Sequence, residues 1–219
     1  MYKELKGIEN VEWAPSGQLL AVIGLNEMII LLNYITWKSL SQLYLDPVIR
    51  ECNYLTKVYK ECADLEKTSN KRFASCEEYV IREIHERPIY IEIGKKDNDN
   101  FSIAKIKLFK FSTCGQYLAL KHELYPTTLW IWNICTDYLD YLLLENPITA
   151  IKWNPVHPQL LVFSECTRVY EWTQKGVKSI PISKNMTRII VDAYWHPTGE
   201  KIALCGYNKA VIYEIANAC

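Results

Sequence analysis

Four histidines are the side chains of this sequence best suited to acid–base chemistry near neutral pH. They are His85, His122, His157 and His196. Catalysis of this kind also needs a nucleophile within reach, and no histidine here is spaced with a serine or cysteine in a recognisable nucleophile motif. We interpret all four as turn or surface residues, because two adjoin prolines, one ends an apolar run and one lies in a charged segment. The sequence predicts no catalytic site and no enzyme.

Eight cysteines are the potential metal ligands or disulfide partners: Cys52, Cys62, Cys76, Cys114, Cys135, Cys166, Cys205 and Cys219. No CxxC or CxxxxH spacing occurs, so we expect no zinc site. The sequence starts Met1-Tyr2-Lys3-Glu4 without an apolar signal segment, which favours a reducing, cytoplasmic compartment over a secreted one. Cys114, Cys166 and Cys205 lie in or beside apolar runs, so we expect them to act as small buried hydrophobes.

Composition excludes further classes of function. The 219 residues include 25 basic and 25 acidic side chains without a basic block, which argues against nucleic-acid binding through clustered Lys and Arg. The 8 glycines form neither a GxGxxG motif nor a P-loop, so we expect no nucleotide and no other cofactor. The longest apolar stretch, 19–32, is interrupted by Asn26 and Glu27, so we expect no membrane insertion.

The elements that must position these residues form a repeat. An aromatic residue, a turn sequence and a short apolar run recur at Trp13, Phe111, Trp153 and Trp195. The last three of these aromatic residues are 42 residues apart. A period near 40 is typical of the four-stranded blades of a β-propeller.

A second landmark has a matching period. Each copy ends its third predicted strand on an apolar or aromatic residue followed by a polar one: Leu32-Asn33, Trp132-Asn133, Trp172-Thr173 and Tyr213-Glu214. We therefore predict an all-β, WD-repeat-like β-propeller of about four recognisable four-stranded blades in a partial ring. The first strands of the blades should begin near residues 8, 104, 149 and 189.

The domain organisation follows from where the repeat is interrupted. Residues 1–45 form the first predicted blade, 46–100 a charged insertion, and 101–219 three consecutive blades. The insertion holds 22 of the 50 charged residues and two possible strands, 54–59 and 88–93, with a loop or short helix expected over 60–75. The last blade lacks a fourth strand, so we expect its edge at 210–215 either to pair with residues 2–5 or to stay open.

The aromatic residues have two predicted roles. Recurrence at fixed positions of the repeat favours a structural anchor buried in each blade, and six residues fit this: Trp13, Phe111, Trp132, Trp153, Trp172 and Trp195. For Trp153→Ala we expect a loss of about 3–5 kcal/mol, the usual cost of emptying a buried aromatic site.

Four other aromatic residues are candidate partner contacts: Trp37, Tyr54, Tyr59 and Tyr90. Trp37 lies in a turn before an outer strand, and the three tyrosines lie in the insertion, outside the repeat. Binding residues concentrate on loops held by a rigid frame, which makes the insertion a candidate site of function. The alternative is that its apolar residues only cap a neighbouring blade.

These residues resemble the WD-repeat propellers and, among them, the family of WD repeat-containing protein 8, found at centrosomes and spindle pole bodies. Four phrases carry the likeness: Gly17–Val22, Asn33–Lys38, Thr128–Asn133 and Tyr194–Gly199. The charged insertion after the Thr36-Trp37-Lys38 turn is similarly placed. The resemblance covers essentially the whole chain but only the C-terminal half of that family.

The resemblance implies a non-enzymatic scaffold that holds microtubule minus ends and supports spindle assembly. Members of the family pair with a coiled-coil anchoring protein and, in fungi, with a minus-end-directed kinesin. This chain departs from standard WD repeats because the Gly-His dipeptide is absent, and Asn33, Asn133, Thr173 or Glu214 replaces the Asp. The alternatives left open are a substrate-recognition propeller of a ubiquitin ligase or other complex, and an enzyme with a site in the central channel.

Overall fold

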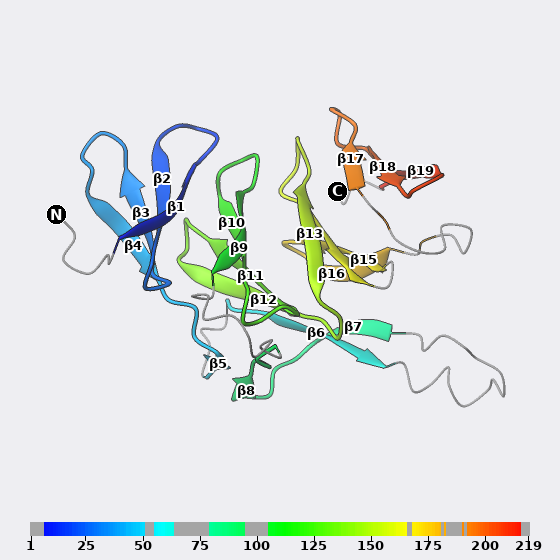
Figure 1. Ribbon diagram of the computed structural model, residues 1–219, viewed down its shortest axis with the longest axis horizontal. Coiled ribbons are helices and arrows are strands. Elements are labelled where there is room, and N and C mark those ends of the chain that lie inside the picture. The colour runs from blue at the N-terminus through cyan, green and yellow to red at the C-terminus, as the bar shows by residue number, and fades with distance from the viewer. Residues whose placement is uncertain are drawn as a thin grey trace.

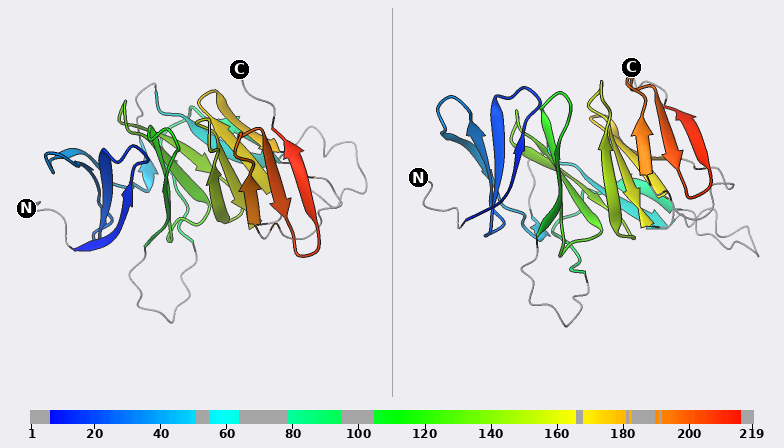
Figure 2. Two further views of the ribbon diagram at one scale, coloured as in Figure 1. Left: turned by 90° about the horizontal axis from the view of Figure 1, so that it is seen from above. Right: turned by 45° about the horizontal axis from the view of Figure 1, so that its top comes forward.

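The computed structural model describes residues 7–50, 55–63, 79–94, 105–165, 168–180, 182, 190 and 192–215. All regular elements in these ranges are β-strands or short turns, which confirms the predicted all-β fold. Figures 1 and 2 show the main sheets standing in a row in chain order, with the first and last sheets at opposite ends.

The first blade is a four-stranded antiparallel sheet in which each strand pairs with the next. Its strands are β1 (Ile8–Trp13), β2 (Leu19–Gly24), β3 (Ile29–Asn33) and β4 (Ser39–Leu43). The β1–β2 hairpin turns through Gly17, whose φ of 69° lies in the left-handed region that glycine adopts without a steric penalty. Most residues of β2 and β3 are apolar and buried, on both faces of the sheet.

The second blade is enlarged by the insertion. Its own strands are β9 (Ile106–Phe111), β10 (Tyr117–His122), β11 (Thr128–Asn133) and β12 (Tyr138–Leu143). Two insertion strands, β6 (Val58–Ala63) and β7 (Tyr79–Glu83), extend this sheet to the order β7-β6-β12-β11-β10-β9. Strand β6 pairs in parallel with β12, and Tyr141 lies opposite Val58.

The other sheets are smaller. The third blade comprises β13 (Ile148–Trp153), β14 (Leu160–Ser164), β15 (Arg168–Thr173) and β16 (Gly176–Ile180). The fourth has three strands among the described residues: β17 (Asp192–Trp195), β18 (Lys201–Cys205) and β19 (Ala210–Glu214). Strands β5 (Val48–Ile49) and β8 (Ile89–Tyr90) form a separate two-stranded sheet.

The insertion is more ordered than the sequence indicates. The first strands of the blades start at 8, 106, 148 and 192, close to the predicted positions. However, the prediction of a loop or short helix over 60–75 is wrong for residues 60–63, because these residues belong to strand β6. The remainder of that segment, and the proposed edge partner at 2–5, lie outside the described residues.

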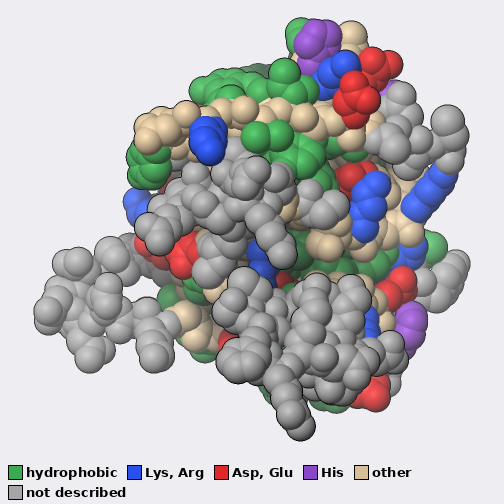
Figure 3. Space-filling model, turned by 90° about the vertical axis from the view of Figure 1, so that its right-hand side faces the viewer, with side chains coloured by type: hydrophobic (Ala, Val, Ile, Leu, Met, Phe, Trp, Pro, Cys, Tyr) green, Lys and Arg blue, Asp and Glu red, His purple; other side chains and the backbone are tan. Residues whose placement is uncertain are grey.

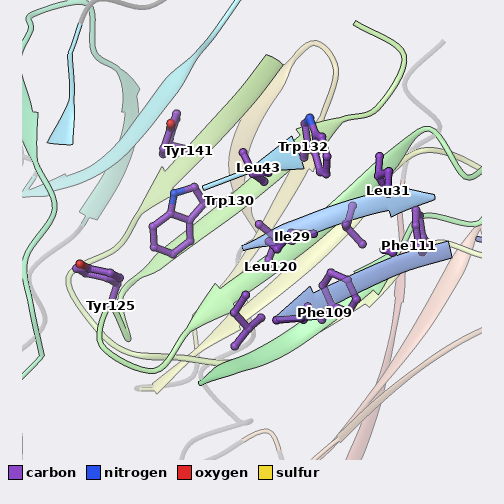
Figure 4. Close-up of a cluster of buried hydrophobic side chains, with 14 of the residues drawn as sticks. Ile29, Leu31, Leu43, Phe109, Phe111, Leu120, Tyr125, Trp130, Trp132 and Tyr141 are labelled. Carbon is purple, nitrogen blue, oxygen red and sulfur yellow. The ribbon is translucent and has the colours of Figure 1, made fainter. Parts of the chain in front are cut away.

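Each blade packs face to face on the next, and we name the two faces by their neighbours. The leading face carries the repeat aromatic of the first strand and points toward the preceding blade; the trailing face points toward the following one. Three apolar clusters fill the three interfaces between successive blades. Figure 4 shows the first of these, where Ile29 and Leu31 of the first blade meet Phe109 and Phe111 of the second.

Candidate partner-binding surfaces

The repeat aromatic residues form a regular hydrogen bond between blades. The Trp153 indole Nε1 donates to the carbonyl of Lys110 at 3.0 Å, and the Trp195 Nε1 donates to that of Lys152 at 3.3 Å. Each acceptor lies one residue before the repeat aromatic of the preceding blade. The position therefore specifies an interface between blades, with both indoles only partly buried.

Trp13 corrects the prediction that every repeat aromatic is a buried anchor. Its side chain is 49% exposed. The reason is positional: no blade among the described residues precedes the first, so the indole lacks the surface on which Trp153 and Trp195 pack. Phe111, at the same position of the second blade, is buried against the first.

Two of the predicted anchors are tryptophans on third strands, and both are buried. Trp132 and Trp172 are almost completely buried. The Trp132 Nε1 donates to Asp137 Oδ1 at 3.0 Å, and the Trp172 Nε1 donates to Asp140 Oδ2 at 3.1 Å. Both carboxylates belong to the outer hairpin of the second blade. Buried indoles usually find such an acceptor, which fixes the ring as well as covering it.

Asp140 is a buried carboxylate at a junction of three elements. It lies on β12, receives the Trp172 indole of the third blade, and accepts a hydrogen bond from the Lys57 backbone N–H of the insertion at 3.2 Å. Burial raises the pKa of Asp140 to about 6, although both hydrogen bonds oppose that shift. The carboxyl group therefore titrates close to neutrality.

A second buried carboxylate clamps the insertion to the third blade. Glu61 on β6 is fully buried; its Oε1 lies 2.6 Å from Arg168 Nη1 and accepts a hydrogen bond from the Tyr170 hydroxyl. The other oxygen accepts the Glu145 N–H at 2.8 Å. Arg168 also stacks over the ring of Tyr79 on β7, 4.0 Å from its centroid. The β6–β7 hairpin is thus held at both of its strands.

Sequence reasoning missed Glu61 and Asp140. The available signal was a charged residue inside an apolar strand, as in Val58-Tyr59-Lys60-Glu61 and Tyr138-Leu139-Asp140-Tyr141. Such a residue must have a partner if it is buried. Its partner, however, belongs to a distant segment that the local sequence does not identify.

The turn at Trp37 is built by an asparagine. Asn33 Oδ1 accepts hydrogen bonds from the backbone N–H groups of Ile35 and Thr36, each at 3.0 Å. Asn133 makes the same pair of contacts in the second blade, to Cys135 and Thr136. Asparagine therefore caps this turn at the position where standard WD repeats carry aspartate.

Trp37 occupies a position of this turn that suits small polar residues. Its φ is +52°, and the equivalent residue four positions after Asn133, Asp137, has a φ of +57°. Asp and Asn tolerate the left-handed region, whereas a bulky aromatic there is a genuine outlier. The indole is also 54% exposed. Burial of the indole therefore does not offset the conformational strain of the positive φ at Trp37.

The other predicted contacts have different environments. Tyr90 on β8 is 72% exposed. Tyr59 on β6 is buried in the cluster between the second and third blades, and burial raises the pKa of its hydroxyl. The partner-contact interpretation of Tyr59 is therefore wrong, because β6 turns this side chain into the sheet stack. Tyr54 lies outside the described residues.

The potentially reactive side chains remain apart. In the described ranges, no group of three or more His, Cys, Asp or Glu residues is arranged to hold a metal ion. His85, His157 and His196 are exposed. His122 is buried, contrary to the prediction, with Nε2 3.5 Å from Glu27 Oε1 at the interface of the first two blades. Cys114 is exposed rather than buried because it lies in the hairpin turn.

The described part of the chain contains no helix with the length and apolar content that crossing a bilayer requires.

Successive sheets of about four antiparallel strands, stacked face to face with one repeated contact, define a protein of the β-propeller class. The chain is similar to WD repeat-containing protein WRAP73 of Mus musculus, with 26% identity over 225 residues. That alignment covers 93% of this chain and 46% of the mouse protein, so the chain spans about half the length of the curated relative. The similarity supports a WD-repeat family. No family model matches the chain.

Two solved structures are distantly similar in shape. A chain of the crystal structure of the mitotic checkpoint complex has a TM-score of 0.39 and 12% identity, covering 95% of this chain and 76% of that one. The β-propeller domain of Myceliophteria thermophila Cps50 (Swd1) has a TM-score of 0.40 and 12% identity, covering 95% and 82%. TM-scores this low give no information on this chain's partners.

Proposed function

We propose that this chain is a non-enzymatic protein-interaction scaffold and that Trp37 is a principal contact residue. The observation that carries the proposal is the exposed indole on a strained, asparagine-capped turn. Strain of this kind persists where the surrounding structure enforces it, and it concentrates at functional sites. Rigid aromatic residues are also the side chains most often dominant in protein interfaces.

A patch of exposed apolar side chains extends this contact surface along the outer part of the first blade. It comprises Ile35 in the same turn, Leu40 on β4 and Tyr44 directly after β4. Trp37 at one end supplies a large, half-exposed aromatic ring, which suits contact with a protein surface.

Tyr90 marks a second candidate contact in the insertion. It lies on the small β5–β8 sheet, next to the exposed Ile93. Ile49 on β5 and Ile91 directly after β8 are buried in the apolar cluster between the first two blades, so this small sheet is packed on the blades. A contact there would restrain a partner at a fixed distance from the Trp37 turn.

The finer proposal concerns where the scaffold acts. The resemblance to the family of WD repeat-containing protein 8 supports a role at the centrosome or spindle pole body, in anchoring microtubule minus ends. The partners would be a coiled-coil anchoring protein and, in a fungal setting, a minus-end-directed kinesin. The similarity to a WD-repeat protein over nearly the whole chain supports the same reading.

Affinity purification with mass spectrometry tests both the scaffold role of Trp37 and the proposed location at the centrosome or spindle pole body. The tagged wild-type chain should recover pole components that include a coiled-coil protein, and Trp37→Asn should lose them while remaining folded. Tyr90→Ser tests the insertion surface, and Tyr207→Ser is its matched control because Tyr207 is equally exposed on the last blade. Recovery of a cullin adaptor in place of pole components would overturn the centrosomal role. Unchanged recovery with Trp37→Asn would remove Trp37 from the interface.

A further inference from the structure

The outer edge of the second blade shows how this fold accepts an additional strand. Strand β12, the fourth strand of that blade, pairs in parallel with β6 of the insertion. The Tyr141 N–H points out of the blade's own strands and donates to the Lys57 carbonyl at 2.9 Å. Val58 of β6 is buried in the apolar cluster between the first and second blades, and Tyr59 in the cluster between the second and third. Backbone hydrogen bonds and buried side chains therefore both hold the added strand.

The outer edge of the first blade has no such strand. The insertion hairpin serves the next two blades, because β6 covers β12 and β7 lies beside β16, the fourth strand of the third blade. Strand β4 is the last in its sheet, and no described strand pairs with its outer side. Neighbouring blades pack on the faces of a blade, so this edge lies at the rim whichever blades stand beside it.

The register of β4 shows which backbone groups lie along this edge. Counted back from the capping asparagine of each blade, Ser41 of β4 and Asp140 of β12 lie opposite equivalent residues of the third strand. The next residue, Gln42, therefore corresponds to Tyr141, and its N–H and C=O point away from β3. The register shift in β4 lies before Ser41, so the pairing is regular from there onward. Gln42 thus offers the outward donor and acceptor of an edge that can take a strand.

Strand β4 also lacks two features with which proteins usually protect an open edge. Such strands tend to carry charged side chains, above all lysine, or a proline. The sequence of β4, Ser39-Leu40-Ser41-Gln42-Leu43, has neither. Its counterpart β16 carries Lys178, and Figure 3 shows basic and acidic side chains among hydrophobic ones on the side that bears the last two blades. The uncharged edge of β4 is suited to pairing.

We propose that an extended segment of a partner protein adds to this edge as a fifth strand, parallel to β4. Its backbone bonds to the N–H and C=O of Gln42, and its apolar side chains take the places that Val58 and Tyr59 take on the second blade. In strand addition the main chain supplies affinity and alternate side chains supply specificity. The inference rests on the scaffold function proposed above, since the Trp37 turn leads directly into β4 and a partner bound there lies beside this edge.

A peptide with the sequence of residues 55–60 is the probe, because it contains the part of β6 that pairs with β12 and ends before the buried Glu61. Amide exchange at Gln42 should be fast in the free chain and slow when the peptide is added to millimolar concentrations. The Ser41 amide, which points toward β3, is the internal control and should be protected in both. The same peptide with Tyr59→Pro lacks the backbone donor and should give Gln42 no protection.

Gln42→Pro tests the edge from the side of the protein. It removes the outward donor without removing a hydrogen bond to β3, and edge strands tolerate proline at such positions. The variant should remain folded by circular dichroism and bind the peptide about tenfold more weakly or worse. Ser41→Pro is the matched control and should instead destabilise the chain in urea, because it removes a bond to β3. In affinity purification, Gln42→Pro should lose the same partner as Trp37→Asn.

Slow exchange at Gln42 in the free chain would overturn the proposal, because this chain or a second copy would already fill the edge. A peptide that leaves Gln42 unprotected, or that binds wild type and Gln42→Pro equally, would overturn it too and would indicate exchange with β6 on β12. Failure of the proposed function is distinguishable. A partner lost with Trp37→Asn but kept with Gln42→Pro removes only the edge contact, whereas the reverse result removes only the Trp37 contact.

Discussion

An indole offers one hydrogen-bond donor, and in this chain the use of that donor separates the tryptophans by role. Trp132 and Trp172 donate to carboxylates of the second blade's outer hairpin, the exposed Asp137 and the buried Asp140, whereas Trp153 and Trp195 donate to backbone carbonyls of the preceding blade. The first group fills volume and satisfies charge, and the second group fixes the spacing of two sheets. Substitutions in the two groups should therefore have different costs.

Trp172→Ala should lower the free energy of unfolding by about 3–5 kcal/mol, because it empties a fully buried site and removes the donor to Asp140 Oδ2. The sequence-based expectation of the same cost for Trp153 is too high for a partly exposed ring. Trp13→Ala is the control, and in dilute solution it should cost less than about 1 kcal/mol. Urea unfolding of the three variants measures this, and equal losses for Trp13 and Trp172 would contradict it.

Trp37→Asn should leave stability unchanged or raise it by up to about 1 kcal/mol, because Asn tolerates the left-handed backbone that Trp does not. The measurement is the shift in urea midpoint at an unchanged slope. Asp137→Trp, the reverse exchange at the equivalent turn, should instead destabilise, since Asp137 accepts hydrogen bonds from Trp132 and Ser41. A marked loss of stability in Trp37→Asn would mean that the indole is structural.

At the scale of the element, the insertion is an extension of the second blade and not a separate loop. Strand β6 continues the sheet beyond β12, and Glu61 ties it to the third blade. Replacing residues 60–86 by a flexible linker would remove two strands of that sheet. Point substitutions on the exposed β5–β8 sheet are therefore the way to separate folding from partner binding in this region.

Glu61→Ala should cost about 3–5 kcal/mol, because removing one partner of a buried ion pair leaves the other uncompensated. Glu12→Gln is the comparison, since the Glu12–Lys110 pair lies at the surface and its loss should cost less than about 1 kcal/mol. Both are read from denaturant unfolding. Similar small losses would show that Glu61 does not clamp the hairpin.

Asp140 should give the chain a pH-dependent stability. Its pKa is raised from 3.8 to about 6, so between these values the folded state holds a proton that the unfolded state has released. The contribution of this group to stability therefore falls as the pH rises from about 4 to about 6, and it is constant above. Asp140→Asn lacks this titration. Its stability relative to wild type should rise over that window, and a difference independent of pH would be inconsistent with the shift.

The four-blade organisation could be predicted from the sequence, whereas the insertion's pairing could not. Hairpin strands follow from local alternation and turn residues, as in Trp13 to Leu20 across the Pro15–Gly17 turn. The partner of β6 is set by contacts between residues 83 apart, such as Lys57 with Asp140, which no local pattern encodes. The repeat also placed Trp13 correctly at the start of the first blade. Its burial could not be predicted, because this position packs on the preceding blade and no such blade is present among the described residues.

At the scale of the whole molecule, the chain is a row of blades in which each contacts its immediate neighbours. Stability in such a row depends on nearest-neighbour interfaces, so units with one neighbour open more readily than those with two. The second and third blades have two neighbours each and are joined by the β6–β7 hairpin.

Amide hydrogen exchange should therefore be slowest in β10, β11 and β14 and fastest, among the strands, in β18 and β19. Uniform protection across all four blades would mean that the chain opens only as a single cooperative unit.

The parallel pairing of β6 with β12 also has a consequence for the order of synthesis. The ribosome makes β6 and β7 before any strand of the sheet that they join, and Lys57 precedes its partner Asp140 by 83 residues. At usual elongation rates the nascent hairpin waits roughly 4–17 s for its template. During that interval the Glu61 carboxylate and the apolar side of β6 lack the neighbours that bury them in the folded chain. The blade that is second in the row therefore completes its outer edge last, after its inner three strands have emerged.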